Sequence, residues 1–281
     1  MAGLLGIPSG TVIQAALTPV ACMIGTEFKP APRADSGGSI MSTLSYDVFV
    51  SDGVPRVTEL RMPDGSGIVS SPVSSTLFYG ERDAVLADPS WTVAQTEALG
   101  EWIERAGKRL AYIYITHGHG DHWFGTAQLL ERFPGATVYA TEGTIRLMHQ
   151  QADSRPDFWD KIFPGLIGET PVLAQPIPAG GFELEGNQLH AIEVGHTDTD
   201  DTTVLHVPSI GLVVAGDVAY NGVHQMLLEI GGTGLKSWLD AIDQVAALHP
   251  SRSSCSGSFL ARLLAAPARK RSTPSVDGRH R

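Results

Sequence analysis

Hydrophobic and polar positions change their spacing several times along this chain. Short apolar or alternating runs, separated by turn residues, predict a first group of strands. These strands cover residues 46–50, 57–61, 73–79 and 84–87. Apolar residues at helical spacing then predict a helix over residues 91–106. The continuous apolar run 110–116 predicts a buried strand, and it ends at a segment rich in histidine.

The same succession of strands and single helices follows a second time. Helices are predicted over residues 122–132, 144–151 and 237–248, and strands over residues 136–140, 189–194, 202–207 and 211–215. Two such groups predict one sheet packed on another with helices outside, an α/β (α+β) chain arranged as a four-layer αββα sandwich. Residues 152–187 mix Pro, Gly and aromatic residues, so we expect an insertion or lid over a cleft. Its apolar rim would include Trp123, Trp159, Phe163 and Leu166.

The composition and net charge limit the classes of partner expected for this chain. The 281 residues carry a formal net charge of −10, which argues against binding to nucleic acid or to an anionic membrane surface. No stretch is long and apolar enough to span a bilayer. The two cysteines, Cys22 and Cys255, form no disulfide framework, and this favours a reducing, cytoplasmic compartment. A small-molecule substrate is therefore the expected partner, and the sequence carries no signal for an oligomeric state.

The charge balance changes abruptly near the carboxyl end. Residues 251–281 hold seven of the 20 Lys and Arg residues but one of the 30 acidic residues. We therefore divide the chain into residues 1–40, an extension rich in Gly, Pro and Ser and expected to be disordered, residues 41–250, the folded domain, and residues 251–281, an atypical basic tail. A nucleic-acid-binding tail and an altered reading frame after Pro250 are two interpretations of this tail, and we favour the second.

The predicted strand 110–116 delivers His117-Gly118-His119-Gly120-Asp121-His122 at its carboxyl end. Three imidazoles and a carboxylate so close together are costly to bury without a common partner. We expect the two glycines to let the backbone turn sharply and bring alternate side chains together. Neutral imidazole and carboxylate are ligands that suit zinc, iron or manganese. The run therefore predicts a metal site.

This run resembles the His-x-His-x-Asp-His signature of the metallo-β-lactamase-fold superfamily. Val194-Gly195-His196-Thr197-Asp198 is similar to the next motif of that family, and Val213-Val214-Ala215-Gly216-Asp217 to the one after it. The resemblance extends from about residue 45 to 248, and it implies a metallo-β-lactamase-like αββα fold. It also implies one metal on His117, His119 and His196, and a second on Asp121, His122 and Asp217, with Asp217 bridging. Zinc is the expected metal, with iron or manganese as alternatives.

The resemblance implies a hydrolase in which metal-activated water attacks an ester, lactone, β-lactam or thioester, and nothing in the sequence selects among them. Asp121 would orient the nucleophile and pass its proton to the leaving group. His224 lies in the loop after Asp217, and together with Tyr220 it is a candidate to contact the substrate or the water. We therefore treat Asp121 and His224 as the catalytic candidates.

The sequence departs from the family at one ligand. Members of the family supply a further His to the second metal, in a Gly-His pair after the last helix, and no such pair follows residues 237–248 here. His249 is expected to be a residue at the helix end, and His280 lies in the unpatterned tail. We therefore expect the second metal site to be weakened. Two alternatives follow: an iron-dependent oxidoreductase of the same fold, or a catalytically impaired member.

Overall fold

The computed structural model describes residues 43–232 and 234–257, which form two mixed β-sheets. The first sheet has the strand order β1 (Ser45–Ser51), β2 (Val73–Tyr79), β3 (Asp83–Ala87), β4 (Arg109–Tyr114), β5 (Thr137–Ala140) and β6 (Gln175–Pro176). The second has the order β11 (Arg252–Gly257), β10 (Leu212–Asn221), β9 (Thr202–Val207), β8 (Asn187–Gly195) and β7 (Phe182–Leu184). Strands β3 to β6 run parallel to one another, as do β10 and β11, and the other neighbours pair antiparallel.

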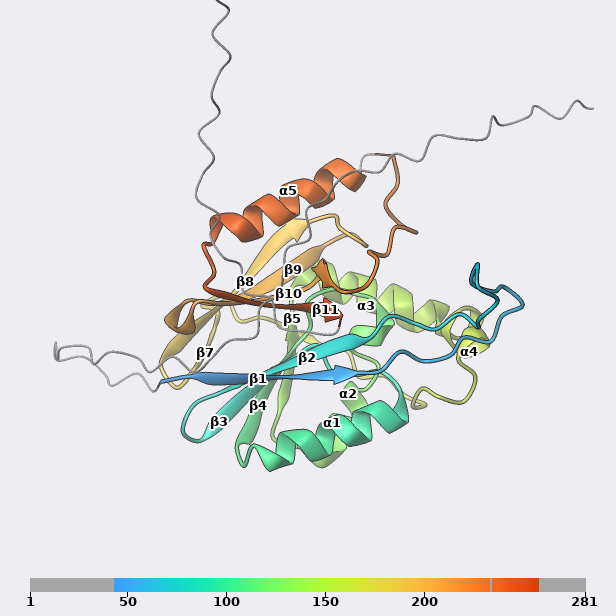
Figure 1. The fold of residues 1–281 in the computed structure, drawn as a ribbon. Helices are drawn as coiled ribbons and strands as arrows, with labels where there is room; N and C mark the ends of the chain where they lie inside the picture. Colours follow the sequence, from blue (N-terminus) through green and yellow to red (C-terminus); the bar gives the residue numbers. More distant parts are fainter. Residues whose placement is uncertain (1–42, 233, 258–281) are drawn as a thin grey trace, which may run out of the picture.

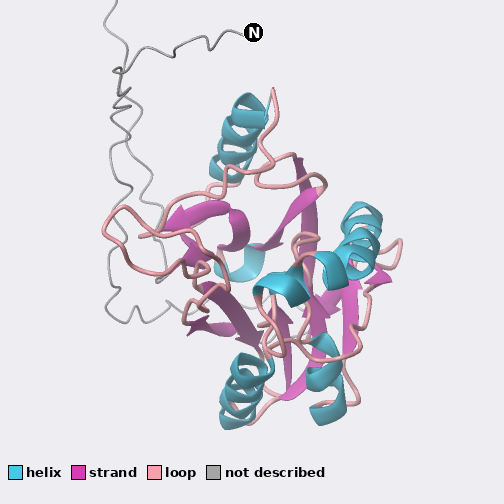
Figure 2. Cartoon of the chain, turned by 90° about the vertical axis from the view of Figure 1, so that its right-hand side faces the viewer, coloured by secondary structure: helices cyan, strands magenta, loops and turns pink. Residues whose placement is uncertain are grey.

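In the part of the chain that the structure describes, five α-helices accompany the sheets: α1 (Val93–Arg105), α2 (Thr126–Arg132), α3 (Glu142–Ser154), α4 (Trp159–Ile162) and α5 (Gly234–Ala247). Figure 1 shows α1 and α2 on the outer side of the first sheet, at the bottom, and α5 on the outer side of the second, at the top. The same layers are seen from the side in Figure 2. Among the described residues, no helix has the length and apolar character needed to cross a membrane.

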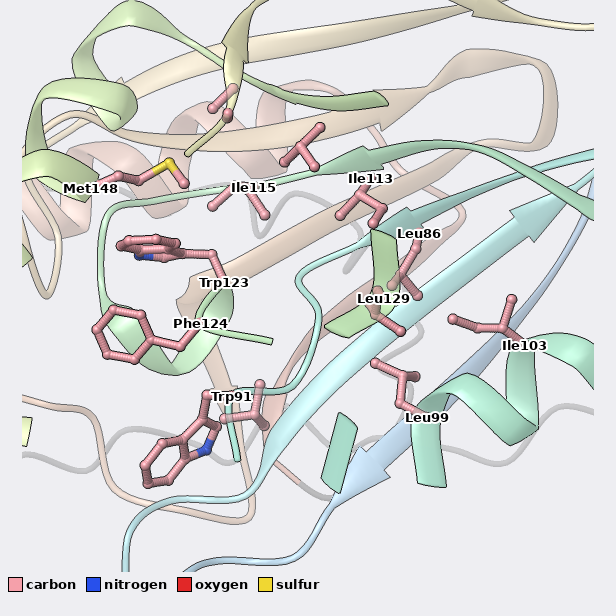
Figure 3. Packing of buried hydrophobic residues seen from close by; sticks show 14 of the residues in the cluster. Leu86, Trp91, Leu99, Ile103, Ile113, Ile115, Trp123, Phe124, Leu129 and Met148 are labelled. Carbon is pink, nitrogen blue, oxygen red and sulfur yellow. The ribbon is translucent and has the colours of Figure 1, made fainter. Parts of the chain in front are cut away.

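Three separate apolar clusters hold these layers together. Leu99 and Ile103 of α1 pack with Leu86 and Ile113 on the outer face of the first sheet (Figure 3). A second cluster lies between the sheets, and a third packs Ala241 and Val245 of α5 against the second sheet. Each sheet therefore buries both of its faces, and the four-layer αββα sandwich expected from the sequence is confirmed.

The structure corrects several expectations. Residues 57–61, predicted as a strand, lie in the segment between β1 and β2, and of these five residues only Arg61 forms an isolated bridge, to Gly67. Trp123, Trp159 and Phe163, expected at an apolar rim, are buried in the first cluster, and of the four only Leu166 is exposed. Trp159 makes edge-to-face contacts with Trp91 and Phe124 and stacks on Phe163, and large aromatic side chains such as these stabilise a core when they are buried.

The boundary drawn after Pro250 also changes. Residues 252–257 form β11, which pairs parallel with β10 and continues the second sheet, so the fold extends at least to Gly257. Hydrogen bonding to a neighbouring strand made this short, polar segment a strand, although its own pattern did not predict one. His249 follows the end of α5 with a positive φ of 48° and an exposed side chain. Residues 1–42 and 258–281, with Cys22 and His280, lie outside the described part of the chain.

Candidate metal centre

The residues of the predicted site come together where strands of the two sheets end. The segment 117–122 follows β4, Asp88 follows β3, and residues 196–201 follow β8. Asp217 lies within β10, the strand of the second sheet that pairs with both β9 and β11. Loops at strand ends can hold polar side chains against a rigid scaffold. This arrangement brings Asp88, the segment 117–122, residues 196–201 and Asp217 to one place.

Two groups of side chains converge closely enough to hold a metal ion. His117, His119 and Asp198 form one group, and His117, His122 and Asp217 form the other. Within each group, the ligand atoms lie within 4.8 Å of one another. His117 belongs to both groups, so the two form one continuous cluster. Imidazole nitrogen and carboxylate oxygen are donors that zinc and iron accept, and three protein ligands leave an open position for a substrate or water.

In the first group, one carboxylate oxygen faces two imidazoles. Asp198 Oδ2 lies 2.8 Å from His119 Nδ1 and 3.5 Å from His117 Nε2. It nevertheless makes no aligned hydrogen bond, whereas Asp198 Oδ1 accepts one from the Thr197 hydroxyl at 2.8 Å. The three side chains are therefore close enough to one another to bind the same ion.

In the second group, His122 lies between two carboxylates. Its Nε2 is 3.2 Å from Asp217 Oδ1, and its Nδ1 is 3.3 Å from Asp88 Oδ2. The other oxygen of Asp217 accepts a hydrogen bond from the hydroxyl of Tyr220, which lies three residues further along β10. Burial, with the charge of Asp217, raises the pKa of Tyr220, so this phenol remains a hydrogen-bond donor across the physiological range.

A buried hydrogen-bond chain fixes the orientation of His117. The Thr116 hydroxyl donates to Asp88 Oδ2 at 2.7 Å, and the Thr116 backbone N–H donates to Asp88 Oδ1 at 2.8 Å. Because that hydroxyl already donates its one proton to Asp88, it can only accept a hydrogen bond from His117 Nδ1, which lies 3.0 Å away. The proton of the neutral ring is therefore assigned to Nδ1, and the lone pair of Nε2 faces the cluster.

Buried atoms without a partner test whether a metal fits these residues. Several polar side-chain atoms of the described residues are buried without a hydrogen bond, and four of them belong to residues of this region: His117 Nε2, His122 Nδ1, His196 Nε2 and Asp198 Oδ2. Each such group costs free energy when it is left unpaired in the interior. Three of the four belong to the two converging groups, and a divalent cation would satisfy His117 Nε2 and Asp198 Oδ2 directly. The donor set therefore fits a metal ion.

The pKa shifts of the histidines also favour a bound cation. Burial lowers the pKa of His117, and a charge on His122 lowers it further. Burial would also lower the pKa of His119 and of His122, but neighbouring carboxylates outweigh it and raise both well above the usual range. Asp198 and Glu229 act on His119, and Asp217 and Asp88 act on His122. This concentration of negative charge attracts a cation, and a metal would have to displace the protons that it holds.

Close packing explains the glycines around the site. A Cβ at Gly118 would lie 2.3 Å from Leu147 Cβ, and one at Gly120 would lie 2.1 Å from the Phe124 ring. Neither has a positive φ, so space, rather than the sharp turn expected from the sequence, requires glycine at both positions. Gly216 has a φ of 51°, and its Cβ would lie 2.5 Å from Thr116 Oγ1.

The predicted site residues divide into two sets. The structure brings His117, His119, His122 and Asp217 into the cluster. His196 and Asp121 are not members of either converging group. His196 Nδ1 is 2.7 Å from Asp200 Oδ1, and its Nε2 is buried without a hydrogen bond, so its role as a ligand stays a prediction. His224 is exposed in the loop 222–232, and its catalytic role stays a prediction.

Sequence reasoning missed or understated three residues at the site. Asp88 was not singled out, although a carboxylate directly after a predicted buried strand is a recognisable signal. Asp198 was not among the expected ligands, yet its carboxylate faces two imidazoles. Glu229 contacts His119 from a loop 110 residues further along the chain, and no local pattern marks it.

Residues 70–257 of the chain match the metallo-beta-lactamase superfamily. Solved structures agree in fold: a metallo-beta-lactamase from Hirschia baltica superposes with a TM-score of 0.54 over 83% of this chain and 93% of its own, at 19% identity. One from Pontibacter korlensis gives a TM-score of 0.53 over 78% of this chain and 94% of its own, at 22% identity. The chain therefore belongs to the metallo-beta-lactamase superfamily.

Curated relatives are similar over shorter stretches. A hydroxyacylglutathione hydrolase from Francisella philomiragia is 41% identical over 64 residues, which are 23% of this chain and 24% of that protein. A metal-dependent hydrolase from Mesorhizobium japonicum is 28% identical over 161 residues, which are 47% of this chain and 63% of that protein. The chain thus spans about a quarter of the length of the first of these relatives.

Proposed function

We propose that this protein is a metal-dependent hydrolase that cleaves an acyl bond in a small molecule: an ester, lactone, β-lactam or thioester. The observation that carries the proposal is the convergence of His117, His119 and Asp198 on one position, with buried ligand atoms that make no hydrogen bond to the protein. Zinc is the expected metal, because its usual ligands in proteins include imidazole and carboxylate. Iron and manganese are the alternatives.

When bound, such an ion lowers the pKa of water toward neutrality and polarises a carbonyl group. The residues of the chain supply the rest. Thr116 and Asp88 hold the ring of His117, and Tyr220 donates to Asp217 and keeps that carboxylate in place. Asp121 lies near enough for its charge to raise the pKa of His119 and of Tyr220. We assign it the orientation of the attacking water and the transfer of a proton to the leaving group.

Within this class, we place a hydroxyacyl thioester first. The support is the local similarity to hydroxyacylglutathione hydrolases, 41% identical over 64 residues in one relative. Lactones, β-lactams and simple aryl esters follow as substrates of the same acyl chemistry. The test measures hydrolysis of one member of each group by the protein loaded with zinc, iron or manganese.

At least one substrate should be hydrolysed, and the activity should disappear on chelation and return with metal. His117→Ala should remove both metal and activity, whereas His149→Ala, a change of an exposed histidine on α3, should alter neither. Full metal occupancy together with no hydrolysis of any of these compounds would show that the proposed function is wrong.

One observation favours a second candidate, an iron-dependent oxidoreductase. Each converging group consists of two histidines and one carboxylate, the ligand set of non-haem iron oxygenases. Metal analysis of the purified protein separates the two candidates. Iron near one per chain, with oxygen uptake and no hydrolysis, would support the oxidoreductase.

A further inference from the structure

Glu229 reaches the metal centre from a segment that the family motifs do not include. It lies in the loop 222–232, between β10 and α5. Glu229 Oε1 is 3.2 Å from His119 Nε2, and Glu229 Oε2 accepts a hydrogen bond from the Thr199 hydroxyl at 3.0 Å. Each carboxylate oxygen therefore has its own partner, and the side chain is held in place although 48% of it is exposed.

His119 consequently has an oxygen at each of its two ring nitrogens. Asp198 Oδ2 lies 2.8 Å from Nδ1, and Glu229 Oε1 lies 3.2 Å from Nε2. The two sides differ in kind. Asp198 belongs to a converging group of ligand atoms, whereas Glu229 does not. The metal therefore belongs on the Nδ1 side, and a neutral ring that binds a metal through Nδ1 must carry its proton on Nε2.

We propose that Glu229 is a positioning residue of the metal centre: its carboxylate accepts the Nε2 proton of His119 and holds the ring with Nδ1 directed at the metal. The inference rests on the proposed function, because it requires His119 to be a ligand. A carboxylate that accepts the second N–H of a ligating histidine fixes the ring and makes it a better ligand.

Two other histidines at the site are held by residues close to them in sequence, and His122 lies between two carboxylates. Thr116 contacts the ring of its neighbour His117, and Asp200 contacts His196 from four residues away. His119 instead depends on a carboxylate from the loop 222–232. The same loop exposes Met226, Leu227 and Leu228. Through Glu229, the metal affinity of the centre is therefore tied to the position of this loop.

The experiment compares zinc affinity, measured by chelator competition, in the full chain and four variants. Glu229→Ala should bind zinc about 10–100-fold more weakly than the parent protein. Glu229→Gln keeps an acceptor without the charge, and should show about half of that loss on a logarithmic scale, because charge-assisted hydrogen bonds are roughly twice as strong as neutral ones. Glu131→Gln, which removes an exposed charge on α2, should bind zinc like the parent. His119→Ala is the reference for a lost ligand.

A second measurement reports on the ring itself. In nitrogen–proton NMR spectra of the zinc-loaded protein, the Nε2–H signal of His119 should be visible in the parent protein. In Glu229→Ala it should be lost to exchange with water, because its acceptor is gone. A residue that only stabilised the fold would lower the melting temperature and leave this signal in place.

The outcomes separate this inference from the proposed function. If Glu229→Ala binds zinc within about twofold of the parent while His119→Ala has lost it, the role of Glu229 is wrong and the metal centre stands; the threshold lies far below the 10–100-fold expected. If His119→Ala also binds zinc like the parent, the metal centre itself is wrong. If Glu229→Ala does not fold, Glu229→Gln decides: an intermediate loss supports the inference, and unchanged affinity overturns it.

Discussion

The two sides of the metal centre are built differently. On the side of the first sheet, Asp88, His117 and His122 are at most 1% exposed, and Thr116 links two of them through hydrogen bonds. On the side of the second sheet, exposure increases away from Asp198: the side chain of His196 is 23% exposed and that of Glu229 is 48% exposed. The first side is part of the core, and the second is made largely of loops.

Because of this difference, we expect the two sides of the metal centre to have different roles. On the buried side, movement would break the hydrogen bonds among Asp88, Thr116 and His117, so these residues are held in fixed positions. Loops on the other side can change more freely and are the usual place for substrate contacts. We therefore expect changes on the first side to affect both metal binding and folding, and changes on the loop side to act mainly on affinity or substrate choice.

The largest effect should follow from His117→Ala, because His117 belongs to both converging groups. Zinc affinity should fall by more than about 100-fold, beyond the range for residues that only support a ligand. Metal analysis after dialysis checks this, with the exposed His149→Ala as control. Retained stoichiometric zinc would show that the buried side does not hold the metal.

Asp88→Asn should have the next largest effect, and should act on both properties. It removes the charge that faces His122 and disturbs the two hydrogen bonds from Thr116. Zinc affinity should fall about 10–100-fold, and the free energy of unfolding should fall by about 1–3 kcal/mol. Chelator competition and urea denaturation measure the two. A loss of affinity with unchanged stability would contradict the view of this side as core.

Zinc affinity should also depend on pH. The pKa values of His119 and His122 lie well above 6.5 in the metal-free protein, so both rings carry protons that zinc must displace. Affinity should therefore rise with pH, by up to about tenfold per pH unit for each proton displaced, and level off above the raised pKa values. The pKa of His117 is lowered, so it releases no proton. Zinc titrations at pH 6, 7 and 8 test this, and constant affinity would contradict it.

The smallest effect on stability is expected from the loop side. Leu228 is 78% exposed in the loop 222–232, so Leu228→Ser should change the free energy of unfolding by less than about 0.5 kcal/mol. Zinc affinity should also stay unchanged, because Glu229 remains in place. Denaturation and chelator competition measure both. A larger decrease in the free energy of unfolding would mean that the loop 222–232 contributes to the stability of the fold as the buried side does.

A feature of the fold or of the metal centre could be predicted when the residues that form it are close together in the sequence. Some segments carry their signal in continuous sequence: the strand before His117, the segment 117–122 and the motif ending at Asp217. The spacing of their apolar residues therefore indicated the four layers, and the types of ligand residue indicated much of the cluster. Strand β11 and the contacts of Asp88, Asp198 and Glu229 arise between segments distant in sequence. Their partners were therefore not visible in any local pattern.

The sequence by itself determined that apolar strands deliver histidines and carboxylates to one place, and that the chain adopts the αββα architecture. The tertiary structure decided which of those groups meet. It brought Asp198, rather than His196, into contact with His117 and His119, and it brought Glu229 to the far nitrogen of His119. The physical reason is that the direction of a side chain at a strand end depends on the packing of the neighbouring loops, and this packing exists only once the two sheets have come together.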